Sequence, residues 1–299
     1  MYIGRFAPTP SGPLHLGSII TAIASYLDAK SNQGKWLLKI DDVDQPRVMK
    51  DADSLILDAL QQLNLHWDGE VIYQSDRLEL YQEQINLLSK LKKTYLCECS
   101  RKELKKTSSS GDQRRVYPGT CREKKIVTKN ATSYRVIVDK HLIEAQDYFE
   151  GLIKQDLNQE VGDFIIKRSD GLFSYQFAVV IDNYLDKITD IVRGSDLIHS
   201  LPRQIYLHQL LGFPAPRFCH IPVATKHQKK LSKGHGDKIN VKGNEISIWL
   251  KCLKFLNQPT EKLSGSMNLN EIIEEAINTW SKKRISSCQQ IEIDGSIHT

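Results

Sequence analysis

The chain has 299 residues, of which 40% are hydrophobic and 26% are charged, as in an ordinary folded globular protein with two or three domains. No apolar run reaches the roughly 18 residues that a membrane-spanning helix needs, which excludes a membrane protein of that kind. The net charge of +5 is compatible with a polyanionic partner, but a mildly basic surface explains it equally well.

The first half of the chain alternates strand-like and helix-like segments. The predicted elements are a strand at 2–6, a helix at 18–30, a strand at 35–40, and helices at 51–65 and 75–93. This alternation favours an α/β fold with a parallel sheet.

The pattern changes near residue 94, where a polar and basic stretch begins. The later predicted elements are strands at 133–138, 161–167, 177–182 and 188–194, and helices within 199–212, 246–256 and 270–280. We therefore predict a doubly wound sheet that is interrupted by an inserted module and followed by a small helical subdomain.

Six cysteines are present, and Met1 leads directly into the first predicted strand without a signal peptide. We therefore expect a cytoplasmic protein with reduced thiols. In that setting clustered cysteines indicate a metal site rather than disulfides, and Cys97, Cys99 and Cys121 lie in the inserted module.

The stretch APTPSGPLHLGS (7–18) joins the first predicted strand to the first predicted helix. Ligands bind at the carboxyl ends of the strands in such sheets, and the start of a helix suits phosphate. Gly17 allows a nucleotide to approach the backbone closely, and His15 can donate hydrogen bonds to phosphate or ribose. This motif by itself could equally be an ordinary proline-rich turn.

A second motif, KKLSKGHG (229–236), places Lys230 and Lys233 in a glycine-rich loop. Lysine suits phosphate oxygens, particularly where negative charge develops in a transition state. In this order the two motifs resemble the signatures of class I aminoacyl-tRNA synthetases. KIDDVDQPR (39–47), YQFAVVIDN (175–183) and DIVRGSDLIHSLPRQIYL (190–207) are similar to further segments of the glutamate-type family.

Only residues 234–299 follow the KLSK motif, which is too short for the anticodon-binding part of full glutamyl-tRNA synthetases. The chain therefore resembles the truncated glutamyl-Q tRNA(Asp) synthetase branch. Val179, where full-length synthetases usually have Asn, favours the same branch. The resemblance implies a Rossmann-like catalytic domain in two halves (1–93 and 166–236), an acceptor-binding-like module with a zinc site (94–165) and a helical subdomain (237–299).

This branch activates L-glutamate with ATP and Mg²⁺ and attaches it to queuosine in the anticodon of tRNA(Asp). The resemblance thus implies a ligase with ATP, L-glutamate and queuosine-containing tRNA(Asp) as partners, and we expect a monomer. Two alternatives stay open: a truncated synthetase that charges a tRNA 3′ end, and a non-catalytic tRNA- or nucleotide-binding module.

Glutamate carries two carboxylates and one ammonium group, so its site needs cations and an anion. Arg5 and Arg193 stand at predicted strand ends and can bind carboxylates, although a surface ion pair would also explain either residue. The resemblance implies that glutamate is contacted by Arg5, Ala7, Thr9, Asp41, Tyr175 and Arg193. Asp41 departs from the family, which usually has Glu there to hold the ammonium group, and Asp42 could contribute to that role. Alternatively, at least one of Asp41, Asp42 and Asp44 caps the helix that follows.

The carboxylate of glutamate is already a nucleophile, so adenylate formation needs positioning and charge stabilisation rather than a general base. We expect His15, Lys230 and Lys233 to be catalytic. The expected ATP-binding residues are His15, Gly17, Ser18 and Lys233, and Mg²⁺ needs no dedicated protein ligands beside ATP.

In the inserted module, the resemblance implies one structural Zn²⁺ held by Cys97, Cys99, Tyr117 and Cys121. Three unrelated free thiols are the alternative, because C-x-C is not the usual zinc spacing and Tyr is a rare ligand. The module is also rich in cations that could meet tRNA phosphates or simply form a solvated surface: Arg101, Lys102, Lys105, Lys106, Arg114, Arg115, Arg122, Lys124 and Lys125.

Overall fold

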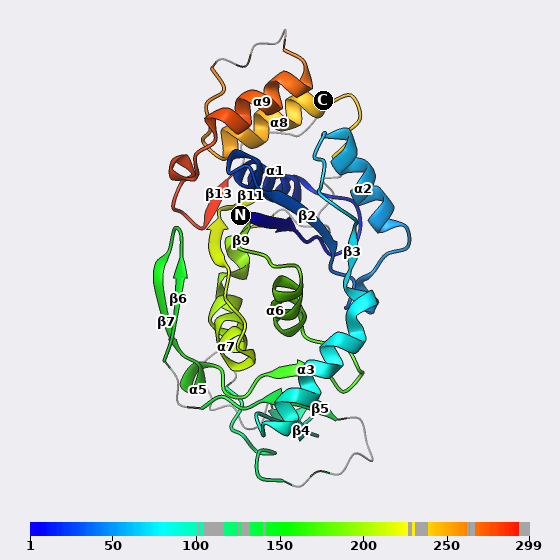
Figure 1. Ribbon diagram of the computed structural model, residues 1–299, viewed down its shortest axis with the longest axis vertical. Helices are drawn as coiled ribbons and strands as arrows, with labels where there is room; N and C mark the ends of the chain where they lie inside the picture. The colour runs from blue at the N-terminus through cyan, green and yellow to red at the C-terminus, as the bar shows by residue number, and fades with distance from the viewer. Residues whose placement is uncertain are drawn as a thin grey trace.

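The computed structural model describes residues 1–100, 102–104, 116–124, 126, 132–139, 142–226, 229–230, 239–261, 263 and 267–292. Helices α8 and α9 lie at one end of the molecule, and strands β4 and β5 lie at the other (Figure 1).

The described elements follow the predicted alternation in the first half of the chain. The strands are β1 (Ile3–Phe6), β2 (Lys35–Ile40), β3 (Ile72–Tyr73), β4 (Thr94–Cys97), β5 (Ser133–Val136), β6 (Leu142–Asp147), β7 (Gly151–Asp156), β8 (Ile165–Lys167), β9 (Asp190–Gly194), β10 (Arg217–Ile221), β11 (Val223–Lys226), β12 (Lys229–Lys230) and β13 (Gln290–Glu292). The α-helices are α1 (Leu16–Ser31), α2 (Ala52–Gln62), α3 (Leu78–Lys90), α5 (Leu157–Glu160), α6 (Tyr175–Leu185), α7 (Leu201–Leu211), α8 (Glu245–Phe255) and α9 (Leu269–Thr279).

Parallel strands form the centre of the catalytic part. Strand β2 pairs in parallel with both β1 and β3, and β9 pairs in parallel with β10. The backbone N–H of Thr189, just before β9, donates to the carbonyl of Ile3 in β1 at 2.9 Å, so the two groups of strands meet there. Strands β1 and β9 are therefore neighbours in space, and the two halves of the sheet meet between them, as the predicted doubly wound fold requires.

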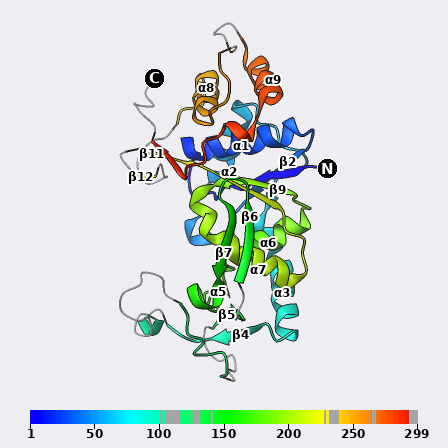
Figure 2. The same ribbon diagram turned by 90° about the vertical axis from the view of Figure 1, so that its left-hand side faces the viewer.

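Two apolar cores cover the two faces of these strands (Figure 2). One contains α1, α8 and α9, with Trp36 and Trp249 among its fully buried side chains. The other is built mainly from α3, α6 and α7. The first core joins the predicted C-terminal helices directly to the first βα unit.

One predicted strand is wrong. Residues 177–182 lie in helix α6, not in a strand. Phe177 to Ile181 are all at most 1% exposed, so this helix segment is buried around its whole circumference. A short, fully buried apolar run carries no periodicity that separates a strand from a helix, which explains the error.

The remaining boundaries shift only slightly. The predicted helix at 75–93 begins with a 3-10 turn (Gln74–Arg77) before α3, and the predicted helices at 246–256 and 270–280 correspond to α8 and α9. Strands β4, β5 and β8 form a small antiparallel sheet in the inserted region. Within the described ranges, no helix combines the length and the apolar character needed to cross a bilayer.

Candidate functional site

The loop after β1 shapes the start of helix α1. His15 is the residue that caps this helix, and its ring Nδ1 accepts a hydrogen bond from the backbone N–H of Ser18 at 3.3 Å. Gly12 adopts a φ of 128°, which a residue with a side chain rarely adopts. The loop therefore turns directly into a helix N-terminus that faces the carboxyl end of the sheet.

A cavity of about 560 Å³ opens at this edge. Its walls come from the β1–α1 segment on one side and from β9 and the start of β11 on the other. Eight of the predicted glutamate and ATP residues line it: Arg5, Ala7, Thr9, His15, Gly17, Ser18, Tyr175 and Arg193.

Three further predicted residues are not among the described residues that line the cavity. Asp41 does not line the cavity. Lys230 belongs to strand β12, where only the backbone is described, and Lys233 lies outside the described residues.

The two arginines are the dominant charges of the cavity. Arg5 and Arg193 are only 5% and 3% exposed. Within the described ranges, neither guanidinium forms an ion pair with a carboxylate, and Nε of Arg5 and Nη2 of Arg193 have no hydrogen-bond partner. Burial, together with neighbouring Arg5, lowers the pKa of Arg193. Two buried guanidinium groups that form no ion pair within the described ranges give this cavity a chemistry that suits a carboxylate.

Asp41 lies behind the cavity wall. It is 7% exposed, and its Oδ1 lies 3.4 Å from Nζ of Lys39. Burial raises the pKa of Asp41 to about 6, even though Lys39 favours the charged form. Its backbone N–H donates to the carbonyl of Pro8 at 3.0 Å, which ties the end of β2 to the first loop.

Sequence reasoning missed a charged cluster centred on Asp182 in α6, which we call the Asp182 cluster. This fully buried carboxylate accepts hydrogen bonds from Lys39 (2.8 Å), Gln74 (2.8 Å), Arg77 (3.1 Å) and Tyr81 (2.7 Å). Although burial alone raises the pKa of Asp182, Lys39 and these hydrogen bonds hold it below its usual value. Its partners come from β2, the turn before α3 and α3 itself, so no local spacing in the sequence could reveal it.

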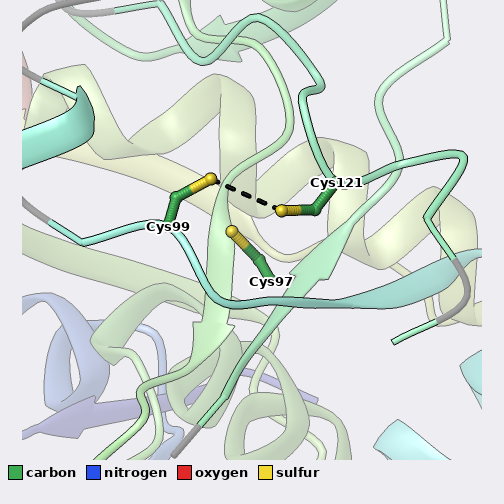
Figure 3. Close-up of side chains that lie close together, drawn as sticks. All are labelled: Cys97, Cys99 and Cys121. Carbon is green, nitrogen blue, oxygen red and sulfur yellow. Dashed lines mark hydrogen bonds between the residues drawn. The ribbon is translucent and has the colours of Figure 1, made fainter. Parts of the chain in front are cut away.

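Three predicted zinc ligands lie close together in the inserted region (Figure 3). The sulfur atoms of Cys97, Cys99 and Cys121 all lie within 4.8 Å of one another, and Cys99 Sγ is 3.4 Å from Cys121 Sγ. Zn–S bonds of 2.3 Å in a tetrahedron separate sulfur atoms by about 3.8 Å. The cluster therefore has the donor atoms and the spacing of a tetrahedral zinc site.

Tyr117 completes this cluster. Its hydroxyl lies 3.4 Å from Cys97 Sγ and 3.6 Å from Cys99 Sγ, and it accepts the backbone N–H of Cys121 at 3.0 Å. The guanidinium of Arg135 lies over the Tyr117 ring at 3.6 Å. The hydroxyl of the fourth predicted ligand thus lies beside the cysteine sulfur atoms.

Few of the predicted tRNA-contacting cations are described. Arg122 donates to Asp163, which is 1% exposed, and Lys124 lies 3.6 Å from Glu98. The Asp163 pair favours a structural role for Arg122. Lys102 is exposed, whereas the others lie outside the described residues: Arg101, Lys105, Lys106, Arg114, Arg115 and Lys125.

Comparison with known proteins agrees with this fold. The family model for the catalytic domain of class I tRNA synthetases (E and Q) matches residues 3–294. The chain belongs to this family of class I tRNA synthetases.

The chain is also similar to individual known proteins over nearly its whole length and theirs. A glutamyl-Q tRNA(Asp) synthetase of Janthinobacterium sp. (strain Marseille) is 41% identical over 290 residues, which cover 94% of this chain and 97% of the relative. One of Vibrio parahaemolyticus is 41% identical over 294 residues, covering 98% and 96%. Among solved structures, the glutamate-tRNA synthetase of Elizabethkingia anophelis superposes with a TM-score of 0.80 at 23% identity, covering 98% of this chain and 68% of that one. That likeness concerns the fold.

Proposed function

We propose that this protein activates L-glutamate with ATP and transfers the glutamate to queuosine in the anticodon of tRNA(Asp). The observation that carries the proposal is the end-to-end similarity to relatives named glutamyl-Q tRNA(Asp) synthetase. The cavity supports it chemically, because two buried arginines without a carboxylate partner suit a dicarboxylic amino acid.

In this proposal, one carboxylate oxygen of glutamate attacks the α-phosphorus of ATP, and pyrophosphate leaves. Arg5 and Arg193 bind carboxylate groups of glutamate. Tyr175, Ala7 and Thr9 line the part of the cavity that holds the amino acid. Asp41, which does not line the cavity, attracts the ammonium group electrostatically. The N-terminus of α1, with Gly17 and Ser18, faces the phosphates.

His15 orients the α-phosphate region in this proposal, and Lys230 and Lys233 stabilise the charge on the departing pyrophosphate. Mg²⁺ accompanies ATP and neutralises part of that charge. A queuosine hydroxyl then attacks the glutamyl carbonyl, which releases AMP and forms an ester bond to the tRNA.

The test is to incubate the protein with ATP, Mg²⁺, labelled glutamate and tRNA(Asp) that either contains or lacks queuosine. Nuclease digestion then locates the label. We expect label only on the queuosine-containing tRNA, in the anticodon fragment. Label in the 3′-terminal fragment regardless of queuosine would establish a truncated synthetase instead, and absence of label on both tRNAs would favour a non-catalytic binding module.

We also propose that Cys97, Cys99, Tyr117 and Cys121 hold one structural Zn²⁺. Thiolates close enough to repel one another are stabilised by a cation (Figure 3). In Figure 1, strand β4, which ends at Cys97, lies apart from β1 and β9, whose residues line the cavity. We expect purified protein to contain one zinc per chain by elemental analysis, and Cys121→Ser to lose it. Cys252→Ser is the matched control, because Cys252 is equally buried but lies in α8. Full zinc content in Cys121→Ser would contradict this assignment.

A cytoplasmic monomer remains our expectation. Sedimentation of the purified protein at a single mass of 34.1 kDa would agree with it, whereas a dimer mass would contradict it.

A further inference from the structure

Arg193 belongs to a chain of three buried side chains that sequence reasoning did not anticipate. Nε of Arg193 in β9 donates to Nε2 of His220 in β10 at 2.8 Å. Nδ1 of His220 in turn lies 2.7 Å from Oδ2 of Asp147, at the end of β6. All three residues are at most 3% exposed, so water does not compete for these bonds.

The chemistry of arginine determines where the protons lie. A guanidinium group has only donors, so Nε2 of His220 must accept and cannot carry a proton. The single ring proton is therefore on Nδ1 and is donated to Asp147. Burial lowers the pKa of His220, and Arg193 lowers it further against the opposing effect of Asp147, so the ring stays neutral.

Asp147 is itself fixed by the backbone. Its Oδ1 accepts the N–H groups of Phe149 at 3.0 Å and Glu150 at 3.1 Å, and its Oδ2 accepts the N–H of His220 at 3.1 Å. The carboxylate is thus anchored in the turn between β6 and β7. This anchoring leaves the imidazole ring of His220 little freedom to rotate.

The other end of Arg193 faces the cavity. Nη1 donates to Oε1 of Gln204 at 2.8 Å and lies 3.5 Å from the hydroxyl of Tyr175. Nη2 has no hydrogen-bond partner in the part of the chain that the structure describes. Arg193 lines the cavity, and its buried Nη2 is the one guanidinium nitrogen whose hydrogen-bonding capacity no described residue uses.

We propose that His220, anchored by Asp147, is a positioning residue that fixes the guanidinium of Arg193 so that Nη2 meets a substrate carboxylate. This inference rests on the proposed function, because the carboxylate is that of glutamate. A free arginine side chain loses much rotational entropy when it binds, and a guanidinium held in advance avoids that loss. His220 therefore strengthens glutamate binding without touching the substrate.

The kinetic test compares three variants in glutamate-dependent AMP formation with queuosine-containing tRNA(Asp). His220→Phe keeps a flat ring but cannot accept the bond from Arg193, and we expect the KM for glutamate to rise at least tenfold while the KM for ATP stays within twofold. His220→Gln can both accept from Arg193 and donate to Asp147, and we expect its KM for glutamate to stay within threefold of wild type.

His208→Phe is the matched control. His208 is also a buried histidine, 1% exposed, and its ring nitrogens have no hydrogen-bond partner among the described residues. Its KM for glutamate should equal that of wild type. An active wild type together with an unchanged glutamate KM in His220→Phe would overturn the inference and leave the proposed function intact. A wild type that does not use glutamate would instead overturn the proposed function.

A second measurement needs neither activity nor a stable Phe variant. The ¹⁵N chemical shifts of the histidine rings in the wild-type protein report the tautomer, and loss of a signal in His220→Gln assigns His220. We expect a neutral ring with the proton on Nδ1. A proton on Nε2, or a charged imidazolium at pH 7, would show that His220 does not accept from Arg193 and would overturn the inference.

Discussion

The Asp182 cluster and the arginine cavity are both buried and charged, yet their hydrogen bonding differs. Asp182 is fully buried and accepts bonds from four side chains, including the cations Lys39 and Arg77. Arg5 and Arg193 are almost as buried but have no carboxylate partner within the described ranges. Removing one partner from a fully paired buried charge is costly for the fold, whereas a buried charge that lacks a partner and lines a cavity is a candidate for ligand binding.

This contrast predicts that the two sites respond oppositely to removal of charge. At the Asp182 cluster, loss of the central charge should reduce stability. In the cavity, loss of a charge should reduce activity and leave stability largely unchanged.

The largest effect is expected for Asp182→Asn. The substitution leaves Lys39 and Arg77 facing a neutral group in the interior, which typically costs about 3–5 kcal/mol in the free energy of unfolding. Urea denaturation measures this change. Glu144→Gln is the control, because Glu144 pairs with Lys154 on an exposed surface and should change stability by less than about 0.5 kcal/mol. Equal stability of the two variants would refute the contrast.

Next in size is Arg5→Met, which removes a guanidinium that we propose binds a substrate carboxylate. We expect kcat/KM for glutamate to fall about 100-fold, or ~2.7 kcal/mol, with a change in unfolding free energy below about 1 kcal/mol. Arg5→Lys keeps the charge but loses the bidentate geometry of arginine. Its kcat/KM for glutamate should therefore lie between those of wild type and Arg5→Met. A severe loss of stability in Arg5→Met, comparable with Asp182→Asn, would mean that Arg5 is structural.

The smallest effect concerns Asp41, which lies between the two sites. Because burial raises its pKa to about 6 in the folded protein, the folded state holds this proton more tightly than the unfolded state does. Its contribution to stability is therefore fully present below the unfolded pKa near 4 and is lost as pH rises to about 6. The side chain of the Asp41→Asn variant is neutral at every pH, so the variant lacks this pH-dependent contribution to stability.

The stability of Asp41→Asn relative to wild type should therefore increase by about 2 kcal/mol between pH 4 and pH 6.5, and then stay constant. Denaturant titrations at several pH values measure this difference. A difference that is independent of pH would show that Asp41 is ionised throughout and is held by Lys39 as firmly as Asp182 is.

Much of the fold followed from local patterns. The βα alternation up to residue 93 and the two C-terminal helices were predicted correctly, because long amphipathic helices and short strands repeat at different periods. Helix α6 was predicted as a strand because its buried core segment shows no such period. The pairing of β13 with β11 joins segments about 65 residues apart, and no local signal announced it.

Some features of the candidate site could likewise be predicted from the sequence, whereas others appear only in the structure. Arginines at strand ends, a glycine and a histidine before a helix, and clustered cysteines are visible in the chain itself, because strand ends and helix starts lie at one edge of an α/β sheet. The sequence by itself therefore determined the family, eight of the residues that line the cavity and the cysteine cluster. Only the tertiary structure decided that His220, bonded to Asp147, accepts a hydrogen bond from Arg193, and that Lys39 and Asp182 form an ion pair. These partners are 27 to 143 residues apart in the chain, and a hydrogen bond depends on distances of a few ångströms that only the packed sheet establishes.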